Sequence, residues 1–529
     1  MPNQFFSPEG DIENYFVTEY WLIDQYIGDE LWTWGYGNEG LLGNAQITNR
    51  STPVTTFSGG TNWKQVDCGF YHAAAIKTDG TLWTWGYGGG GRLGNALTSG
   101  NRSTPVTTFS GGTNWKQVSC GDTYGAAIKT DGTLWTWGIA SNGRLGNGAT
   151  TGNISTPVTT FAGGTNWKQV SCANGFTAAI KTDGTLWTWG NGAVGRLGNG
   201  ATTGSISTPV TTFAGGTNWK QVSANNNSCA AVKTDGTLWT WGQGNVGQLG
   251  NTSTSNVSTP VTTFAGGTNW KQVACGFIHT VAIKTDGTLW VWGYNLNGNL
   301  GNAVTTNTST PVTTFAGGNN WKQVTGGDQH TAAIKTDGTL WIWGNRTYGQ
   351  LGDTFRATTI TSGGSMNASS NTVSISTTGL AIGDKVQFTS PTNNNVNGAT
   401  ILSIGSGTVT LSLSNSATFY SGTFTFLRSI SGTSTPVTTF AGGTNWKQVS
   451  GGEDCTIAIK TDGTLWGWGT SGYAQLGNGL ISGVGDSTVK KITFGVSTPV
   501  TTFAGGTNWK QVSTSSNNTS ALTYDDPVI

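Results

Sequence analysis

Short segments in which apolar and polar residues alternate recur along most of the chain, separated by stretches rich in Gly, Asn and Thr. Four such segments follow one another in a fixed order, typified by TLWTW, PVTTF, WKQV and AAIK. Alternation with a period of two predicts β-strands, because successive side chains of a strand point to opposite faces of a sheet. No segment has the periodicity of an amphipathic helix, so the pattern predicts an all-β protein.

The four segments repeat eight times. Each unit opens with LWxWG, and these motifs begin at Leu31, Leu82, Leu134, Leu186, Leu238, Leu289, Leu340 and Leu465. The KTDGT between AAIK and the next LWxWG is typical of a tight hairpin turn. Four short antiparallel strands in each repeated unit predict the blades of a β-propeller, in which ring closure protects the sheet edges. Three Trp per unit account for 24 of the 25 in the chain, so we expect them to pack between blades.

The string LWTWGxxxxGxLGN…STPV…WKQVxCGxxHxAAIKTDG resembles the repeat of the regulator of chromosome condensation family. The resemblance covers residues 31–357 and 434–529. It implies a propeller that usually has seven blades, whereas eight units are present, so the expected fold has eight, alternatively seven, four-stranded blades. Residues 20–30 resemble a degenerate AAIKTDG strand and compete with residues 520–526 for the strand that closes the ring.

An insertion interrupts the seventh unit. Residues 358–433 alternate apolar and polar positions around Gly and Asn turns, which predicts a separate small β-sandwich or barrel. Its GLAIGDKV…GATILSIGSGTVTLS pattern resembles small β modules of bacteriophage tail and fibre proteins. The propeller is therefore expected to comprise residues 31–357 and 434–529, on either side of this domain.

Residues 1–30 form an acidic and aromatic leader that resembles the starts of repeat proteins encoded by marine bacteriophages. It serves either as a closing strand of the propeller or as a peptide that docks onto other virion or tail proteins, and the two roles are compatible. The candidate docking residues are Phe16, Tyr20, Trp21, Leu22 and Tyr26.

The charge is small overall but unevenly distributed. The formal net charge is +1; the leader carries seven acidic residues and no Lys or Arg, so it has −7 and the remainder has +8. The basic excess consists of regularly spaced single lysines, which argues against nucleic-acid binding. No apolar run reaches the length of a membrane span, and the N-terminus lacks the pattern of a secretory signal. We expect no membrane insertion and a location in a virion, extracellular after release.

No residue pattern indicates an enzyme, a cofactor or a metal site. Lys77 and Asp79 recur together at every KTDGT turn, whereas a catalytic pair needs one perturbed environment. His72, His279 and His330 occupy one repeat position that other units fill with other residues, which favours hydrogen bonding within strands over metal binding. The cysteines lie in separate units with no CxxC, so we expect small buried side chains instead of disulfides: Cys68, Cys120, Cys172, Cys229, Cys275 and Cys455.

Two windows of each unit vary while the strand segments stay nearly identical. One follows LWxWG and the other follows KQV, and loops on a rigid scaffold are common sites of recognition. Relaxed drift without any ligand is the alternative. The candidate binding residues are Tyr36, Tyr87, Tyr124, Tyr294, Tyr348, Tyr473, Phe70, Tyr71 and Phe277.

These observations predict a non-enzymatic bacteriophage virion or tail protein in an oligomeric assembly. The loops and the inserted domain would recognise a host-surface glycan or protein. The alternative is an intracellular or secreted interaction scaffold from a bacterium or protist. Nucleotide exchange on a small GTPase and ultraviolet sensing, both known in the family, are disfavoured because their required loops and Arg–Trp clusters are not recognisable here.

Overall fold

The structure is a computed structural model that describes most of the repeat region and part of the insertion. The described residues are 30–57, 62–345, 351, 360–366, 372–375, 385–389, 401–405, 408–411, 420–427, 432–439, 443–452, 454–469, 476, 496–501, 509–514 and 518–523. The leader residues predicted to dock, from Phe16 to Tyr26, lie outside them, as do Tyr348 and Tyr473.

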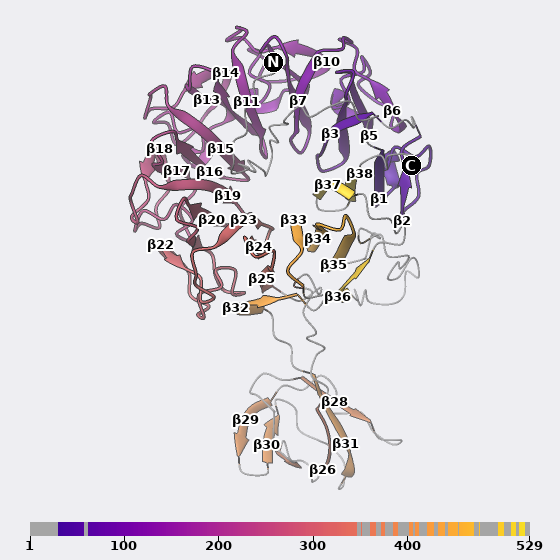
Figure 1. Cartoon of the computed structure of the whole chain (residues 1–529), viewed down its shortest axis with the longest axis vertical. Coiled ribbons are helices and arrows are strands. Elements are labelled where there is room, and N and C mark those ends of the chain that lie inside the picture. Colours follow the sequence, from indigo (N-terminus) through magenta and orange to yellow (C-terminus); the bar gives the residue numbers. More distant parts are fainter. Residues whose placement is uncertain are drawn as a thin grey trace, which may run out of the picture. The chain divides into compact units, whose positions relative to one another are not determined.

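Eight four-stranded antiparallel sheets form the blades of a β-propeller (Figure 1). The innermost strand of each blade is the WKQV segment, in β3 (Trp63–Cys68), β7 (Trp115–Cys120), β11 (Trp167–Cys172), β15 (Trp219–Asn225), β19 (Trp270–Cys275), β23 (Trp321–Gly326), β33 (Trp446–Gly451) and β37 (Trp509–Thr514). The second strand contains AAIK or its variants, in β4 (His72–Lys77), β8 (Tyr124–Lys129), β12 (Phe176–Lys181), β16 (Ser228–Lys233), β20 (His279–Lys284), β24 (His330–Lys335), β34 (Cys455–Lys460) and β38 (Asn518–Thr523).

The third and fourth strands complete each blade outwards. The LWxWG segments form β1 (Leu31–Gly35), β5 (Leu82–Gly86), β9 (Leu134–Ile139), β13 (Leu186–Asn191), β17 (Leu238–Gly242), β21 (Leu289–Gly293), β25 (Leu340–Asn345) and β35 (Leu465–Gly469). The STPVT segments form the outer edges, β2 (Arg50–Thr55), β6 (Arg102–Thr107), β10 (Asn153–Thr159), β14 (Ser205–Thr211), β18 (Val257–Thr262), β22 (Thr308–Thr313), β32 (Gly432–Thr438) and β36 (Val496–Thr501). A Pro in each outer strand suits an edge, because Pro donates no ladder hydrogen bond.

The ring has eight blades, and this decides between the two predicted counts in favour of eight. Each blade begins with the WKQV strand, whereas the sequence repeat begins with LWxWG. A blade therefore combines the last two strands of one repeat with the first two strands of the next. The closing blade therefore has the order β2-β1-β38-β37 and joins both ends of the repeat region. Leu31 of β1 lies opposite Leu522 of β38, so residues 518–523 occupy the closing position for which residues 20–30 were the competing prediction.

Apolar side chains from facing blades form the core between them. In one such cluster Ile180 and Leu186 of one blade pack with Trp219, Val222 and Trp241 of the next. Within a blade the Trp rings also meet edge to face; the centroids of Trp167 and Trp189 are 6.0 Å apart at 68°. The predicted packing of Trp between blades is confirmed.

In the part of the chain that the structure describes, short 3₁₀ turns follow four of the third strands: η1 (Asn38–Gly40), η2 (Gly89–Gly91), η3 (Ser141–Gly143) and η4 (Ala193–Gly195). Within the described residues, no helix is long and apolar enough to cross a membrane.

Residues 354–431 form a second compact unit. Its described strands make one antiparallel six-stranded sheet in the order β28-β31-β26-β27-β30-β29. The strands are β26 (Ile360–Met366), β27 (Thr372–Ile375), β28 (Lys385–Thr389), β29 (Ile401–Gly405), β30 (Thr408–Leu411) and β31 (Tyr420–Leu427). In the chain, this unit interrupts the connection between β25 and β32 of one blade.

Candidate functional site

The two variable windows of every blade leave from the same end of the sheet. The four strands are antiparallel, so the connection from first to second strand and that from third to fourth strand share one end. We call this end the loop face. The opposite end, the turn face, carries the KTDGT turns and the GGTN segments that lead to the next blade. Sequence variation is therefore concentrated on one face of the propeller.

Backbone hydrogen bonds tie the two variable windows of a blade together. The Tyr87 N–H donates to the Tyr71 carbonyl at 2.8 Å, and the Tyr294 N–H donates to the Ile278 carbonyl at 3.0 Å. The Arg144 guanidinium also donates to the Thr123 hydroxyl at 2.6 Å, which joins the same two windows through side chains. In the blades that have such bonds, the two windows thus form one continuous surface.

Several predicted binding residues lie exposed on this face. Phe70 and Tyr71 contact each other edge to face at 4.5 Å, and Phe277 is likewise exposed. Tyr87 is exposed on one side while the Arg92 guanidinium packs 4.6 Å from its ring centroid. Tyr36 and Tyr294 are half-buried.

The prediction for Tyr124 is wrong. Its side chain is fully buried in the interblade core, and its hydroxyl hydrogen-bonds the Thr177 hydroxyl of the next blade at 2.9 Å. Tyr124 starts β8, the place that His72 takes at the start of β4. A residue at that position packs between blades and is not available to a ligand.

The inner strands of all eight blades line a central cavity of about 440 Å³. Its wall also includes the first residues of the variable window after KQV, so Phe70, Phe277 and Asn174 belong to it. The lining residues include three aspartates, Asp67, Asp122 and Asp328, and no Lys, Arg or His among the described residues. The cavity therefore has a polar wall whose ionisable side chains, apart from thiols, are acidic.

Side chains join neighbouring inner strands around this cavity. The Gln65 amide donates to the Val118 carbonyl at 3.2 Å and its oxygen accepts from the Val118 N–H at 3.1 Å. The Ser119 hydroxyl accepts from the Cys172 N–H at 3.1 Å, and equivalent residues repeat both contacts in later blades. The K-Q-V-S segment thus fixes the inner ring, and its regular use of Gln and Ser has a structural cause.

The three histidines are buried and serve packing. His279 and His330 hydrogen-bond Thr331 and Thr456 of the next blade at 2.9 Å through Nε2. Burial lowers the pKa of His279 to about 4 and that of His330 to about 3, so both are neutral at pH 7. The blade next to His72 carries Gly125 at the repeat position of Thr331 and Thr456, so His72 has no equivalent hydroxyl partner, and burial lowers its pKa to about 3.

The prediction of small buried side chains is confirmed for five of the six cysteines. All six cysteines are free, and all but Cys68 are buried. Burial raises the pKa of Cys172 and Cys275 to about 12, which keeps both as neutral thiols. Among the described residues, no three His, Cys, Asp or Glu side chains come close enough together to hold a metal ion.

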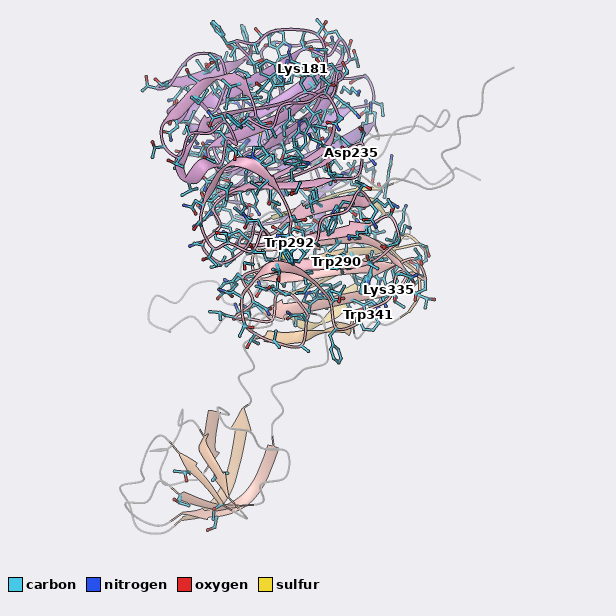
Figure 2. The ribbon with its side chains drawn as sticks, turned by 90° about the vertical axis from the view of Figure 1, so that its left-hand side faces the viewer. Lys181, Asp235, Trp290, Trp292, Lys335 and Trp341 are labelled. Carbon is cyan, nitrogen blue, oxygen red and sulfur yellow. The ribbon has the colours of Figure 1, made fainter. Side chains whose placement is uncertain are left out.

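The Lys–Asp pair of KTDGT has a structural explanation on the turn face. Lys335 Nζ lies 4.6 Å from the Trp321 centroid and 4.9 Å from that of Trp341, a double cation–π contact. Figure 2 labels Lys335 and Trp341 of this cluster. Asp337 instead accepts hydrogen bonds from the Thr339 N–H at 2.9 Å and the Thr339 hydroxyl at 2.6 Å. The lysine and the aspartate thus have different partners, and the same arrangement recurs in other blades. Lys77 itself is buried, with its ammonium group 4.7 Å from the ring centroids of both Trp63 and Trp83.

A ring of exposed aromatic side chains was not predicted. The PVTTF segment was expected to be a strand throughout, but the outer strands end before its Phe, which is about 70% exposed in each described case. These residues are Phe57, Phe109, Phe161, Phe213, Phe264 and Phe315. These Phe residues follow the end of the outer strand, on the side of the turn face. The alternation of apolar and polar residues continues to the Phe, so it does not show that the strand ends before it.

Comparisons with known proteins agree with this architecture. The RCC1-like domain matches residues 111–423, and the regulator of chromosome condensation (RCC1) repeat matches residues 29–76 and 79–128. The ultraviolet-B receptor UVR8 of Arabidopsis thaliana is 32% identical over 330 residues, 61% of this chain and 75% of that protein. The E3 ubiquitin-protein ligase HERC2 of Homo sapiens is 30% identical over 244 residues, 46% of this chain but 5% of that protein.

A solved structure shows the same fold. Prp20p from Saccharomyces cerevisiae superposes with a TM-score of 0.55 at 15% identity, covering 95% of this chain and 94% of that chain. The repeat, the four-stranded blades and the match over more than half of the sequence lead to one conclusion: the chain belongs to the RCC1-like family of β-propellers.

Proposed function

We propose that the protein is a non-catalytic recognition scaffold that binds another macromolecule, foremost a protein, through the loop face. The observation that carries this proposal is the location of both variable windows at one end of all eight blades. The two windows of a blade are also joined by hydrogen bonds, as between the Tyr87 N–H and the Tyr71 carbonyl. Sequence drift without a ligand gives no reason for the variable positions to form one joined surface. A rigid ring with one variable end is suited to recognition.

Exposed aromatics at this face support the proposal. Phe70, Tyr71 and Phe277 are each more than a third exposed, and aromatic residues supply much of the binding energy of protein interfaces. UVR8 is by name a receptor, which agrees with a recognition role for a similar propeller. Nothing in the buried histidines or the Lys–Asp turns favours catalysis.

The finer form of the proposal is a bacteriophage virion or tail protein that recognises a host-surface protein or glycan. Its support is the resemblance of the leader and the inserted sheet domain to segments of phage proteins. Mass spectrometry of purified virions should detect the chain at a stoichiometry of a structural component. Absence from purified virions would overturn this form in favour of an intracellular or secreted scaffold.

A loop-face variant tests the scaffold itself. Phe70→Asn with Tyr71→Thr installs the residues that other blades carry there, Asn174 and Thr123, and should preserve the fold. We expect binding to host cells, or to the virion fraction, to fall by about tenfold or more. The matched control is Phe109→Ser, which removes an exposed aromatic ring from the outer rim. Equal loss in both variants, or no loss in the first, would contradict a site on the loop face.

A further inference from the structure

One residue on the cavity wall breaks the regularity of the inner strands. The position after KQV is a small residue in seven blades: Ser119, Ser171, Ser223, Ala274, Thr325, Ser450 and Ser513. In β3 it is Asp67. This side chain is 7% exposed and lines the cavity. Asp67 therefore places a carboxyl group on the cavity wall at a position where the other seven blades have Ser, Ala or Thr.

The structural role of this position does not require a carboxylate. Asp67 Oδ2 accepts a hydrogen bond from the Cys120 N–H of the next blade at 2.8 Å. In the following blades the Ser119 and Ser223 hydroxyls accept the equivalent bonds from Cys172 and Cys275. A hydroxyl is therefore enough to join the blades, and the charge of Asp67 needs another explanation.

A buried carboxylate is stable only when an opposite charge or strong donors compensate it. Burial raises the pKa of Asp67 to about 7, against the opposing effect of the Cys120 and Cys68 N–H groups. The described cavity lining offers no Lys, Arg or His. The charge that balances Asp67 is thus not supplied by the wall of the cavity.

The rest of the wall suits an organic cation. Phe70 and Phe277 belong to the cavity lining, and aromatic rings attract ammonium groups through cation–π contacts. Asp122 and Asn174 add oxygen atoms to the same wall. A cavity of about 440 Å³ is within the range of small-ligand sites and accommodates the end of an extended side chain.

We propose that the central cavity binds a primary ammonium group carried by a lysine side chain of the protein partner, with Asp67 as its counter-ion. This proposal rests on the proposed function, since it names the part of the partner that enters the ring from the loop face. The repeat supplies Ser at this position in five of the other blades, so Asp67→Ser removes the charge and keeps the bond to Cys120.

Titration calorimetry with defined probes tests the proposal. The probes are the peptide acetyl-Gly-Lys-Gly-amide, the same peptide with norleucine in place of Lys, and free 1,5-diaminopentane. At pH 8 and about 20 mM ionic strength, where screening is weak, we expect the Lys peptide alone of the two peptides to bind. Asp67→Ser should weaken its binding by about tenfold or more, whereas Asp79→Ser, on the turn face, should leave it unchanged.

Acidification gives an independent readout. The titratable groups near Asp67 are the thiols of Cys68, Cys120 and Cys172 and, on the same cavity wall, the carboxyls of Asp122 and Asp328. Burial keeps the pKa of Cys120 and Cys172 far above neutrality, so both stay uncharged at pH 6 and at pH 8. Wild-type binding should therefore weaken from pH 8 to pH 6 as Asp67 takes up a proton, and Asp67→Ser should remove that dependence.

Three results would overturn the proposal: binding of the norleucine peptide as tight as that of the Lys peptide, Asp67→Ser binding within twofold of wild type, or no binding of the Lys peptide at all. Binding of 1,5-diaminopentane without the Lys peptide would overturn it in favour of a free diamine. The proposed function fails by a different result, the insensitivity of partner binding to Phe70→Asn with Tyr71→Thr. Failure of the lysine-site proposal and failure of the proposed function can therefore be told apart.

Discussion

The turn face and the loop face of the same blades follow opposite rules. On the turn face, Lys181 lies 4.7 Å from the Trp167 centroid and 4.6 Å from that of Trp187, and other blades repeat this arrangement almost atom for atom. On the loop face, neighbouring blades carry different residues after the same strands. The comparison shows that sequence identity follows the contacts that hold strands and blades together. Where those contacts end, the sequence is free to differ.

The largest expected effect comes from removing a buried tryptophan of the repeated interior. Trp189 is fully buried between blades, and its indole N–H donates to the Arg144 carbonyl at 2.9 Å. Trp189→Ala should lower the free energy of unfolding by about 3–5 kcal/mol in chemical denaturation. Phe161→Ala is the control, because this ring is 74% exposed and its loss should change stability by less than about 0.5 kcal/mol. Similar losses for the two would contradict the division between interior and rim.

An effect of intermediate size on the free energy of unfolding is expected from replacing Asp67, and both its sign and its dependence on pH differ from those of a turn-face aspartate. The pKa of Asp67 is raised to about 7 in the folded protein, so the wild type loses stability as pH rises from the unfolded value near 4 through 7. Asp67→Ser should therefore be the more stable protein at pH 8, by roughly 2–4 kcal/mol, and the difference should shrink toward pH 4. Denaturation midpoints at the two pH values measure it.

The turn-face aspartates provide the opposite case. The Thr133 hydroxyl and N–H hold the pKa of Asp131 below its usual value, so its stabilising contribution is present above the unfolded pKa and is lost as pH falls through the folded pKa. Asp131→Ser should be less stable than wild type at neutral pH and should approach it in acid. The same direction of change for Asp67→Ser and Asp131→Ser would contradict the pKa directions assigned to the two carboxyls.

The smallest expected effect concerns the cation–π contact of the turn face. Lys181→Met keeps the aliphatic stem and removes the charge between Trp167 and Trp187. A loss of about 0.5–1 kcal/mol in the free energy of unfolding is expected. Lys116→Met removes an exposed lysine of an inner strand and should have no measurable effect. If the two variants are indistinguishable, the lysine–tryptophan cluster is a by-product of packing.

The sequence was sufficient to predict the strands, the turns and the propeller, because every unit repeats the same alternation and the same Trp positions. It did not show which strands share a blade, since a repeat has no inherent starting point. Pairing of Leu31 with Leu522 depends on closure of the ring, and no local pattern encodes it. The buried position of Tyr124 had a signal, its alignment with His72, but the prediction treated it as part of a loop.

The candidate site was less predictable for a related reason. The loops after KQV were identified because they vary, and Phe70 and Phe277 do line the cavity. Asp67 was also visible as a departure from Ser within otherwise identical strands. Its meaning depends on the cavity, which exists only when all eight inner strands face one another. The burial of Asp67 and the lack of Lys, Arg and His on the described part of the wall are therefore visible only in the structure.

The closing blade has a consequence for synthesis of the protein. Strands β1 and β2 leave the ribosome first among the propeller strands, yet their neighbours β37 and β38 leave last. Until then, the edge of β1 that will pair with β38 has no partner, while later blades can already stack on one another. Completion of the ring therefore waits for residues 509–523, and a nascent chain that stalls before residue 509 remains an open arc whose terminal sheet edges are unpaired.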